Sequence, residues 1–281
     1  MNDGAPAYGA VPRLRLSACH SDGEIAMKPD DLKARLRVVG RGILDFVFPP
    51  LCAACRSPVN KTHNLCARCW GRINFISEPM CVICGFPFEF DVETETLCAA
   101  CQQRLPAFDR ARALMRYDDA SRDPILVLKR ADRLDLVPAF ARWVSGAGRD
   151  LIQDADVILP VPLHRWRLWH RRFNQSALIA LSLGKLAGKP VDCFVLVRTR
   201  ATPSQGDMPS AAARRRNVQG AFGVRSDRAG RLHGKSVLLV DDVFTTGSTI
   251  EACARTLKRA GAARVLVLTV ARVVRPVTKP I

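Results

Sequence analysis

Eight cysteines in four C-x-x-C pairs constrain the fold of this chain more than any other feature of its sequence. Each group of two pairs supplies four thiolates, which is the ligand set of a closed tetrahedral structural zinc site. A segment of about 50 residues buries little core, so metal ligation would supply much of its folding free energy, on the order of 10 kcal/mol or more per zinc. The two groups are Cys52-x2-Cys55-x10-Cys66-x2-Cys69 and Cys81-x2-Cys84-x13-Cys98-x2-Cys101.

Other uses of these cysteines stay open at this point. An iron–sulfur cluster would take the same ligands, whereas a redox C-x-x-C fits one pair better than four pairs in matched units. The spacing does not decide between sites made of consecutive pairs and crossed sites (first with third, second with fourth). Gly85 fits the turn after Cys84, which favours a residue without Cβ, and His63 is expected at the surface. A closed site offers no position to a substrate, so the metal is expected to be structural.

The chain carries a formal net charge of +17, from 43 Lys and Arg against 26 Asp and Glu. Such an excess attracts polyanions, whether phosphorylated metabolites or nucleic acid, and a solvated Arg-rich surface accounts for it equally well. No run approaches the roughly 20 apolar residues that a bilayer requires. The N-terminus lacks the apolar segment of a secretory signal. We therefore expect a cytoplasmic protein without a membrane span.

Composition and hydrophobic periodicity divide the chain into five segments. The first has no periodicity and contains two candidate start residues, Met1 and Met27. The second repeats apolar residues at helical spacing from the N-cap Asp30 to the proline pair at Pro49. Pro106 marks the boundary after the cysteines. The predicted segments are 1–29 (tail), 30–48 (amphipathic helix), 49–106 (double zinc ribbon), 107–275 (second domain) and 276–281 (tail).

Strands alternate with helices in the second domain. This alternation predicts an α/β fold with a mostly parallel sheet that is covered by helices on both faces. Gly261 is a suitable residue to end the last helix. The predicted strands are 110–117, 156–161, 191–197, 237–240 and 264–270, and the predicted helices are 124–144, 174–186 and 248–260.

The most specific stretch of the sequence is VLLVDDVFTTGST, from Val237 to Thr249. A buried strand ends in the carboxylates of Asp241 and Asp242, at the edge where ligands bind in open α/β sheets. A turn rich in hydroxyls then opens a helix, whose free N–H groups and dipole attract a phosphate. An ordinary turn capped by Ser248 or Thr249 requires neither the acidic pair nor four hydroxyls. The candidate contacts after the acidic pair are Val243, Phe244, Thr245, Thr246, Gly247, Ser248 and Thr249.

This stretch resembles the phosphoribosyl pyrophosphate (PRPP) loop of type I phosphoribosyltransferases nearly residue for residue. With the cysteine ribbons in front, about residues 44–272 resemble the ComF family, which is related to competence proteins of bacterial DNA uptake. Arg172 departs from this family's usual Gly, and the loop between Gln205 and Asn217 is about one residue longer than usual. The supporting motifs are PVPLH at 160–164, RRFNQ at 171–175, TPSQ at 202–205 and RRRNVQGAF at 214–222.

The resemblance implies a role for each motif. Asp241 and Asp242 would hold the ribose of PRPP, which binds with Mg²⁺, and Lys129 would be a further catalytic residue. From the residues alone, Lys129 also suits a plain surface position, and Asn174 suits an N-cap. The pyrophosphate loop would comprise Pro160, Val161, Pro162, Leu163 and His164. A mobile loop and basic contacts would add Arg171, Asn174, Gln205, Arg214 and Asn217.

Three functions follow from these patterns. The first is a phosphoribosyltransferase that moves the phosphoribosyl group of PRPP to an unidentified acceptor, although no base pocket is recognisable. The second is a PRPP sensor that binds without turnover. The third is an adaptor for single-stranded DNA or for a DNA-uptake or helicase protein, favoured by the positive charge and by the tryptophans between Arg165 and Arg172, which also suit a core or an interface.

Overall fold

A computed structural model describes residues 49–60, 64–93, 95–128, 131–165, 168–169, 172–201 and 210–274. The chain divides into two units between Phe48 and Pro49, and the second unit holds all of these residues. The predicted tails and the helix predicted over 30–48 lie outside the described residues. So do His63, Lys129, Arg171 and Gln205. Within the described part, no helix is long and apolar enough to cross a membrane.

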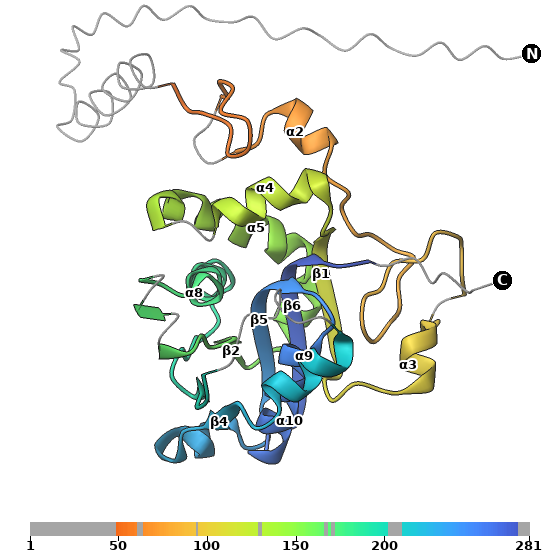
Figure 1. The fold of residues 1–281 in the computed structure, drawn as a ribbon, viewed down its shortest axis with the longest axis vertical. Coiled ribbons are helices and arrows are strands. Elements are labelled where there is room, and N and C mark those ends of the chain that lie inside the picture. The colour runs from red at the N-terminus through yellow and green to blue at the C-terminus, as the bar shows by residue number, and fades with distance from the viewer. Residues whose placement is uncertain are drawn as a thin grey trace, which may run out of the picture. The chain divides into compact units, whose positions relative to one another are not determined.

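A parallel sheet of four strands lies at the centre of the described residues, in the order β1-β6-β5-β2 (Figure 1). Along β5 and β6, successive residues alternate between two hydrophobic clusters on opposite faces of the sheet, which is why both strands read as continuous apolar runs. This arrangement confirms the predicted parallel sheet. The strands are β1 (Arg110–Arg116), β2 (Val157–Pro160), β5 (Ser236–Phe244) and β6 (Arg264–Arg272).

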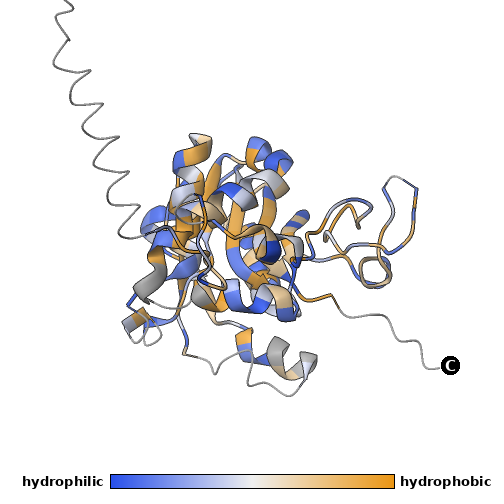
Figure 2. Ribbon diagram, turned by 90° about the horizontal axis from the view of Figure 1, so that it is seen from above, coloured by the Kyte–Doolittle hydropathy of each residue, from blue (hydrophilic) through white to orange (hydrophobic). Residues whose placement is uncertain are grey.

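Helices cover both faces of the sheet, and the hydrophobic strands lie between helices of mixed hydropathy (Figure 2). The apolar residues of α10 recur at helical spacing and pack on one face. Four other helices contribute to the cluster on the opposite face. The helices of that face are α4 (Asp119–Val127), α5 (Val137–Ala147), α6 (Arg149–Asp154) and α8 (Gln175–Ala187). Helix α10 spans Ser248–Arg259 and contacts α9 (Ala211–Val218).

The helix predicted over 124–144 is wrong, because two helices occupy this region with the 3-10 turn Ala131–Leu136 between them. The first begins earlier than predicted, at a capping box in which Ser121 N donates to Asp118 Oδ1 (2.9 Å) and Asp118 N donates to Ser121 Oγ (2.9 Å). The second begins at Val137 with Pro138 in its first turn. A proline is tolerated in the first turn of a helix, and Pro138 occupies that position in α5.

The strand predicted over 191–197 is largely wrong. Only its end forms β3 (Leu196–Arg198), which pairs antiparallel with β4 (Phe222–Val224) outside the main sheet. Phe194 N donates to Asp192 Oδ1 (2.9 Å), and such an Asx turn interrupts the extended chain. Val191 keeps a single parallel bridge to Ile158 of β2.

The cysteine-rich segment lies along the outer edge of β1. Ile76 N donates to Leu114 O (2.9 Å), and Ala111 N donates to Ile83 O (2.6 Å). These bonds satisfy backbone groups that an edge strand would otherwise expose. Two short helices, α2 (Ala67–Gly71) and α3 (Ala99–Gln103), each begin directly after a ligand cysteine. Both cysteine groups are therefore attached to the sheet that carries the acidic pair.

Candidate functional site

The acidic pair lies within β5. The strand was predicted to end at Val240, but its pairing with β6 continues through Asp241 to Phe244, which is the register partner of Arg272. Backbone pairing does not depend on side-chain polarity, so the change from apolar to acidic residues does not end the strand. Both carboxylates are half-buried. They lie at the carboxyl edge of the sheet, as predicted.

The N-terminus of α8 donates to both carboxylates. Ser176 Oγ donates to Asp241 Oδ1, and Gln175 Nε2 donates to Asp242 Oδ2, each at 2.9 Å. Ser176 and Gln175 are 2% and 3% exposed. A charged acceptor makes these buried bonds stronger than neutral ones. Each carboxylate thus has one oxygen held by α8, and these bonds orient the acidic pair.

Asn174 connects this helix to the neighbouring strand. It is the N-cap of α8, where its Oδ1 accepts from Ser176 N at 3.1 Å, and its Nδ2 donates to Val161 O at 3.0 Å. Val161 N in turn donates to Val240 O at 2.9 Å. Asn174 thus has the capping role and also joins β2 to the acidic pair. Sequence analysis gave no role to Ser176, whose only signal was its position directly after the N-cap and Gln175.

The hydroxyl-rich turn joins β5 to α10. Gly247 has a φ of +73°, and a Cβ at this position would lie 2.9 Å from Cζ of Phe244. The turn therefore needs glycine for both its conformation and its close approach to that ring. Thr246 Oγ1 and Ser248 Oγ lie 2.9 Å apart. Gly247 is the N-cap of α10, so the alternative of a helix capped by Ser248 or Thr249 is wrong.

The turn at 160–164 follows β2 at the same edge of the sheet. Pro160, Val161 and Pro162 are buried, whereas Leu163 and His164 are half-buried. Because β2 pairs with β5, this turn begins beside the strand that carries the acidic pair. It therefore lies near the acidic pair at the same edge of the sheet.

The remaining predicted contacts lie on other elements. Asn217 and Arg214 belong to α9, and the carbonyl oxygen of Asn217 accepts from Arg200 Nη2 at 3.1 Å. Helix α9 packs against α10, the helix that the hydroxyl turn opens. Lys129, Arg171 and Gln205 are outside the described residues, so their roles stay predictions.

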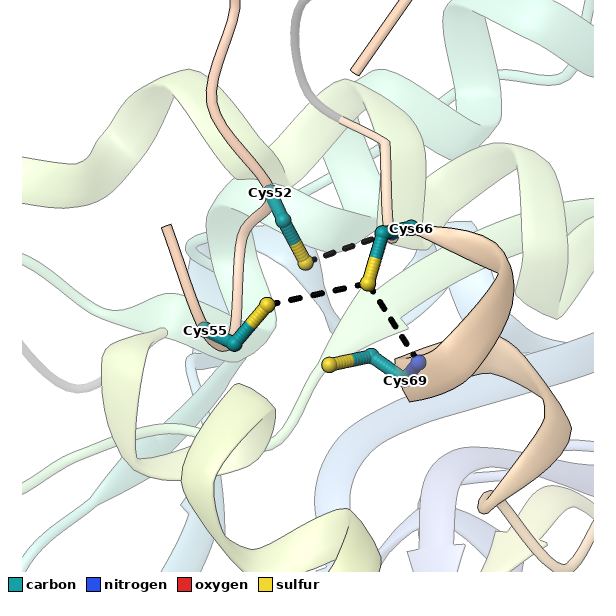
Figure 3. Close-up of side chains that lie close together, drawn as sticks. All are labelled: Cys52, Cys55, Cys66 and Cys69. Carbon is teal, nitrogen blue, oxygen red and sulfur yellow. Dashed lines mark hydrogen bonds between the residues drawn. The ribbon is translucent and has the colours of Figure 1, made fainter. Parts of the chain in front are cut away.

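The eight paired cysteines form two groups of four, and each group consists of consecutive pairs. Within each group, all Sγ atoms lie within 4.8 Å of one another (Figure 3 shows the first group). The Sγ atoms of Cys55 and Cys66 are 3.6 Å apart, and those of Cys84 and Cys98 are 3.5 Å apart. Tetrahedral zinc with Zn–S bonds of about 2.3 Å requires about 3.8 Å. Both groups fit zinc, and the crossed arrangement is excluded.

Family comparisons agree with this geometry. The double zinc ribbon domain family matches residues 43–102, and the phosphoribosyl transferase domain family matches residues 176–278. The DNA utilization protein YhgH of Escherichia coli K12 is 34% identical over 230 residues, which are 80% of this chain and 97% of that protein. The chain belongs to the ComF family. Competence protein F of Haemophilus influenzae is 28% identical over 79% of this chain and 96% of its own length.

More distant similarities extend to other bacteria and to solved structures. Competence protein ComFC of Bacillus subtilis is 25% identical over 72% of this chain and 80% of its own length. The purine phosphoribosyltransferase of Pyrococcus horikoshii is 19% identical over 56% of this chain and 79% of that chain, with a TM-score of 0.30. The two family models show that this ComF chain consists of a double zinc ribbon followed by a phosphoribosyltransferase-like domain.

The two zinc sites of this ComF chain differ in their surroundings. In the first, Cys55 is exposed, and its hydrogen bonds with Ser57 lower the pKa of the thiol to about 6. In the second, all four cysteines are buried. Hydrogen bonds with Cys81 and Cys98, together with burial, raise the pKa of the Cys84 thiol. Metal ligands must be deprotonated, so proton binding and zinc binding compete at Cys84.

A pocket of about 430 Å³ separates the second zinc site from the hydroxyl turn. Its lining includes Cys84 and Cys101 of the zinc site and Thr246, Gly247 and Ser248 of the turn. A larger cleft of about 900 Å³ extends from Ser248 along the outer face of α10. Neither cavity was evident in the sequence, because their walls come from segments that are far apart along the chain.

Proposed function

We propose that this ComF chain binds PRPP together with Mg²⁺ at the carboxyl edge of β2 and β5, and transfers its phosphoribosyl group to an acceptor. The arrangement of the acidic pair carries this proposal. Asp241 and Asp242 stand beside a turn that opens a helix with free N–H groups, and both are oriented by donors from α8. Carboxylates accept hydrogen bonds from ribose hydroxyls, and the N-terminus of a helix attracts phosphate.

Each element has one task in this proposal. The turn from Thr245 to Thr249 holds the 5′-phosphate, the acidic pair holds the ribose hydroxyls, and the turn at 160–164 contacts the pyrophosphate. In the reaction, the bond from the anomeric carbon to pyrophosphate breaks as the acceptor forms its own bond to that carbon. Mg²⁺, when bound, supplies positive charge for the departing pyrophosphate. The chain itself orients the ribose, so no protein nucleophile is required.

Binding and turnover are separable in one experiment. A ligand that binds only the folded state raises stability by about 2.7 kcal/mol at a hundredfold excess over Kd. Wild type should therefore show a higher Tm with PRPP and Mg²⁺, and Asp241→Asn combined with Asp242→Asn should abolish this increase. Release of pyrophosphate in the presence of candidate acceptors measures transfer. An increase in the Tm of wild type without any release of pyrophosphate would favour a PRPP sensor over a transferase. No increase in the Tm of wild type would refute both functions.

A second function, binding of single-stranded DNA, is favoured by a separate surface. Trp169 is 77% exposed, which argues against a core role for this residue. Together with Arg165, Leu168 and Arg172 it lines a hollow of about 680 Å³. A base stacked on an exposed Trp contributes about 1–3 kcal/mol, and neighbouring arginines attract the backbone phosphates. The names of the bacterial relatives, DNA utilization and competence proteins, also associate those proteins with DNA.

Anisotropy of a labelled oligothymidine distinguishes this function from PRPP binding. Trp169→Ala should weaken DNA binding at least tenfold and leave the PRPP-dependent increase in Tm unchanged. Rising salt should weaken the binding of wild type, because phosphate contacts release counterions. Equal affinity of wild type and Trp169→Ala would exclude this surface.

A further inference from the structure

Arg272 is a buried cation next to the second zinc site. It ends β6, is 8% exposed, and pairs with no carboxylate among the described residues. Its guanidinium donates instead to the carbonyl oxygen of Cys84, and its Nη2 lies 3.5 Å from Cys84 Sγ. Its Nε has no hydrogen-bond partner in the described part of the chain. A buried charge is costly unless it is compensated, and the cysteine group is the source of negative charge that the guanidinium contacts.

The second zinc site carries a buried negative charge when the metal is bound. Four thiolates and one Zn²⁺ carry a net charge of −2, and the four cysteines are between 0% and 8% exposed. Water therefore contributes little to solvating this charge, unlike at the first site, where Cys55 is exposed. Hydrogen bonds and cations around the ligands must stabilise this negative charge instead. Arg272, with its single positive charge beside Cys84, offsets one of these two negative charges.

The same guanidinium also contacts the base of the hydroxyl turn. It lies 4.4 Å from the ring centroid of Phe244 and 5.5 Å from that of Phe86, which belongs to the second ribbon. The Phe244 ring in turn lies directly under Gly247, where a Cβ would approach it to 2.9 Å. A chain of contacts therefore runs from Cys84 through Arg272 and Phe244 to the turn.

We propose that Arg272 is a positioning residue through which the second zinc site, and not the first, sets the affinity of the hydroxyl turn for a phosphoribosyl ligand. This inference rests on the proposed function. The metal fixes the ribbon that carries Cys84, so its loss frees the Cys84 carbonyl oxygen from Arg272. The pocket of about 430 Å³ that Arg272 lines offers the guanidinium a way towards water. Once Arg272 leaves, the Phe244 ring and the turn above it lose their support.

Zinc release and PRPP binding test this link in the full chain. Arg272→Met keeps the apolar stem and removes the charge, and Arg264→Met is a matched control at the exposed end of the same strand. A chromogenic chelator should release one of the two zinc ions at least tenfold faster from Arg272→Met than from wild type. The Kd for PRPP with Mg²⁺ should rise at least tenfold in Arg272→Met. Arg264→Met should change neither value. Cys55→Ser, which lacks a ligand of the first site, identifies the release phase of the second.

A reciprocal measurement on wild type separates positioning from mere stability. Binding equilibria that are coupled affect each other equally, so saturating PRPP should slow zinc release from the second site and leave the first unchanged. Because this measurement uses only wild type, it tests the link between the second zinc site and the turn even if Arg272→Met does not fold. Unchanged release in both phases, or a PRPP affinity of Arg272→Met within twofold of wild type, would overturn the link. A wild type that binds no PRPP refutes the proposed function instead, and the release rates of Arg272→Met still decide whether Arg272 supports the zinc site.

Discussion

The two zinc sites have the same ligands and nearly the same spacing, yet they have different relations to the fold. The residue after the second ligand has a positive φ in both, +62° at Arg56 and +66° at Gly85. Arg56 is exposed, whereas a Cβ at Gly85 would lie 2.5 Å from the carbonyl oxygen of Ala111 in β1. The ligands determine that a metal binds. The neighbouring residues determine whether that metal supports only its own ribbon or also the domain beside it.

Removal of one ligand at each site should give the largest difference. Cys84→Ser should lose one zinc and destabilise the chain by several kcal/mol, because a structural zinc contributes on the order of 10 kcal/mol to folding. Hydrogen exchange should then increase at residues 244–249 and at the end of β6. Cys55→Ser should also lose one zinc, with faster exchange confined to residues 49–76. Equal exchange maps for the two variants would show that the sites are equivalent.

Substitution of the residue after the second ligand tests the difference between the two zinc sites without removing a metal ligand. Gly85→Ala should cost about 3 kcal/mol or more, because a left-handed non-Gly residue costs about 1–2 kcal/mol and the clash with a backbone oxygen adds to it. Arg56→Gly relieves the same conformation at an exposed position and should change stability by less than about 1 kcal/mol. Urea unfolding of both variants gives these values. A loss of unfolding free energy in Arg56→Gly as large as that in Gly85→Ala would contradict this comparison of the two sites.

A smaller effect is expected at the two rings that contact Arg272. Phe244→Leu should raise the Kd for PRPP about fivefold, because a cation–π contact contributes about 0.5–2 kcal/mol and this ring supports the turn. Phe86→Leu should hasten zinc release and change PRPP affinity less, since Phe86 lies on the ribbon side of the guanidinium. Calorimetric titration of each variant measures the affinities. A larger change in PRPP affinity for Phe86→Leu than for Phe244→Leu would show that Phe244 does not support the turn.

Local patterns predicted the elements whose determinants are adjacent in sequence. The helix after Gly247 and the apolar run of β6 were found because one short segment contains each entire signal. The interruption between α4 and α5 was missed, although Pro138, which lies in the first turn of α5, is a local signal for the start of a helix. The Asx turn at Asp192 was missed because an apolar run of strand character surrounds it.

Contacts between distant segments were not predictable from the sequence. Gln175 and Asp242 are 67 residues apart, and Cys84 and Arg272 are 188 residues apart. Nothing in either segment indicates that the other lies beside it, because parallel sheets pair strands through long crossovers. The choice of consecutive over crossed cysteine pairs was hidden for the same reason, since it depends on how each ribbon folds back.

Calorimetric titration of PRPP into the zinc-loaded chain tests the central claim most directly. We expect saturable binding of one PRPP per chain in the presence of Mg²⁺. Asn in place of both Asp241 and Asp242 should weaken this binding by more than a hundredfold and leave both zinc ions bound. Binding of equal strength in wild type and in the double variant, or no binding to the zinc-loaded wild type, would contradict the account.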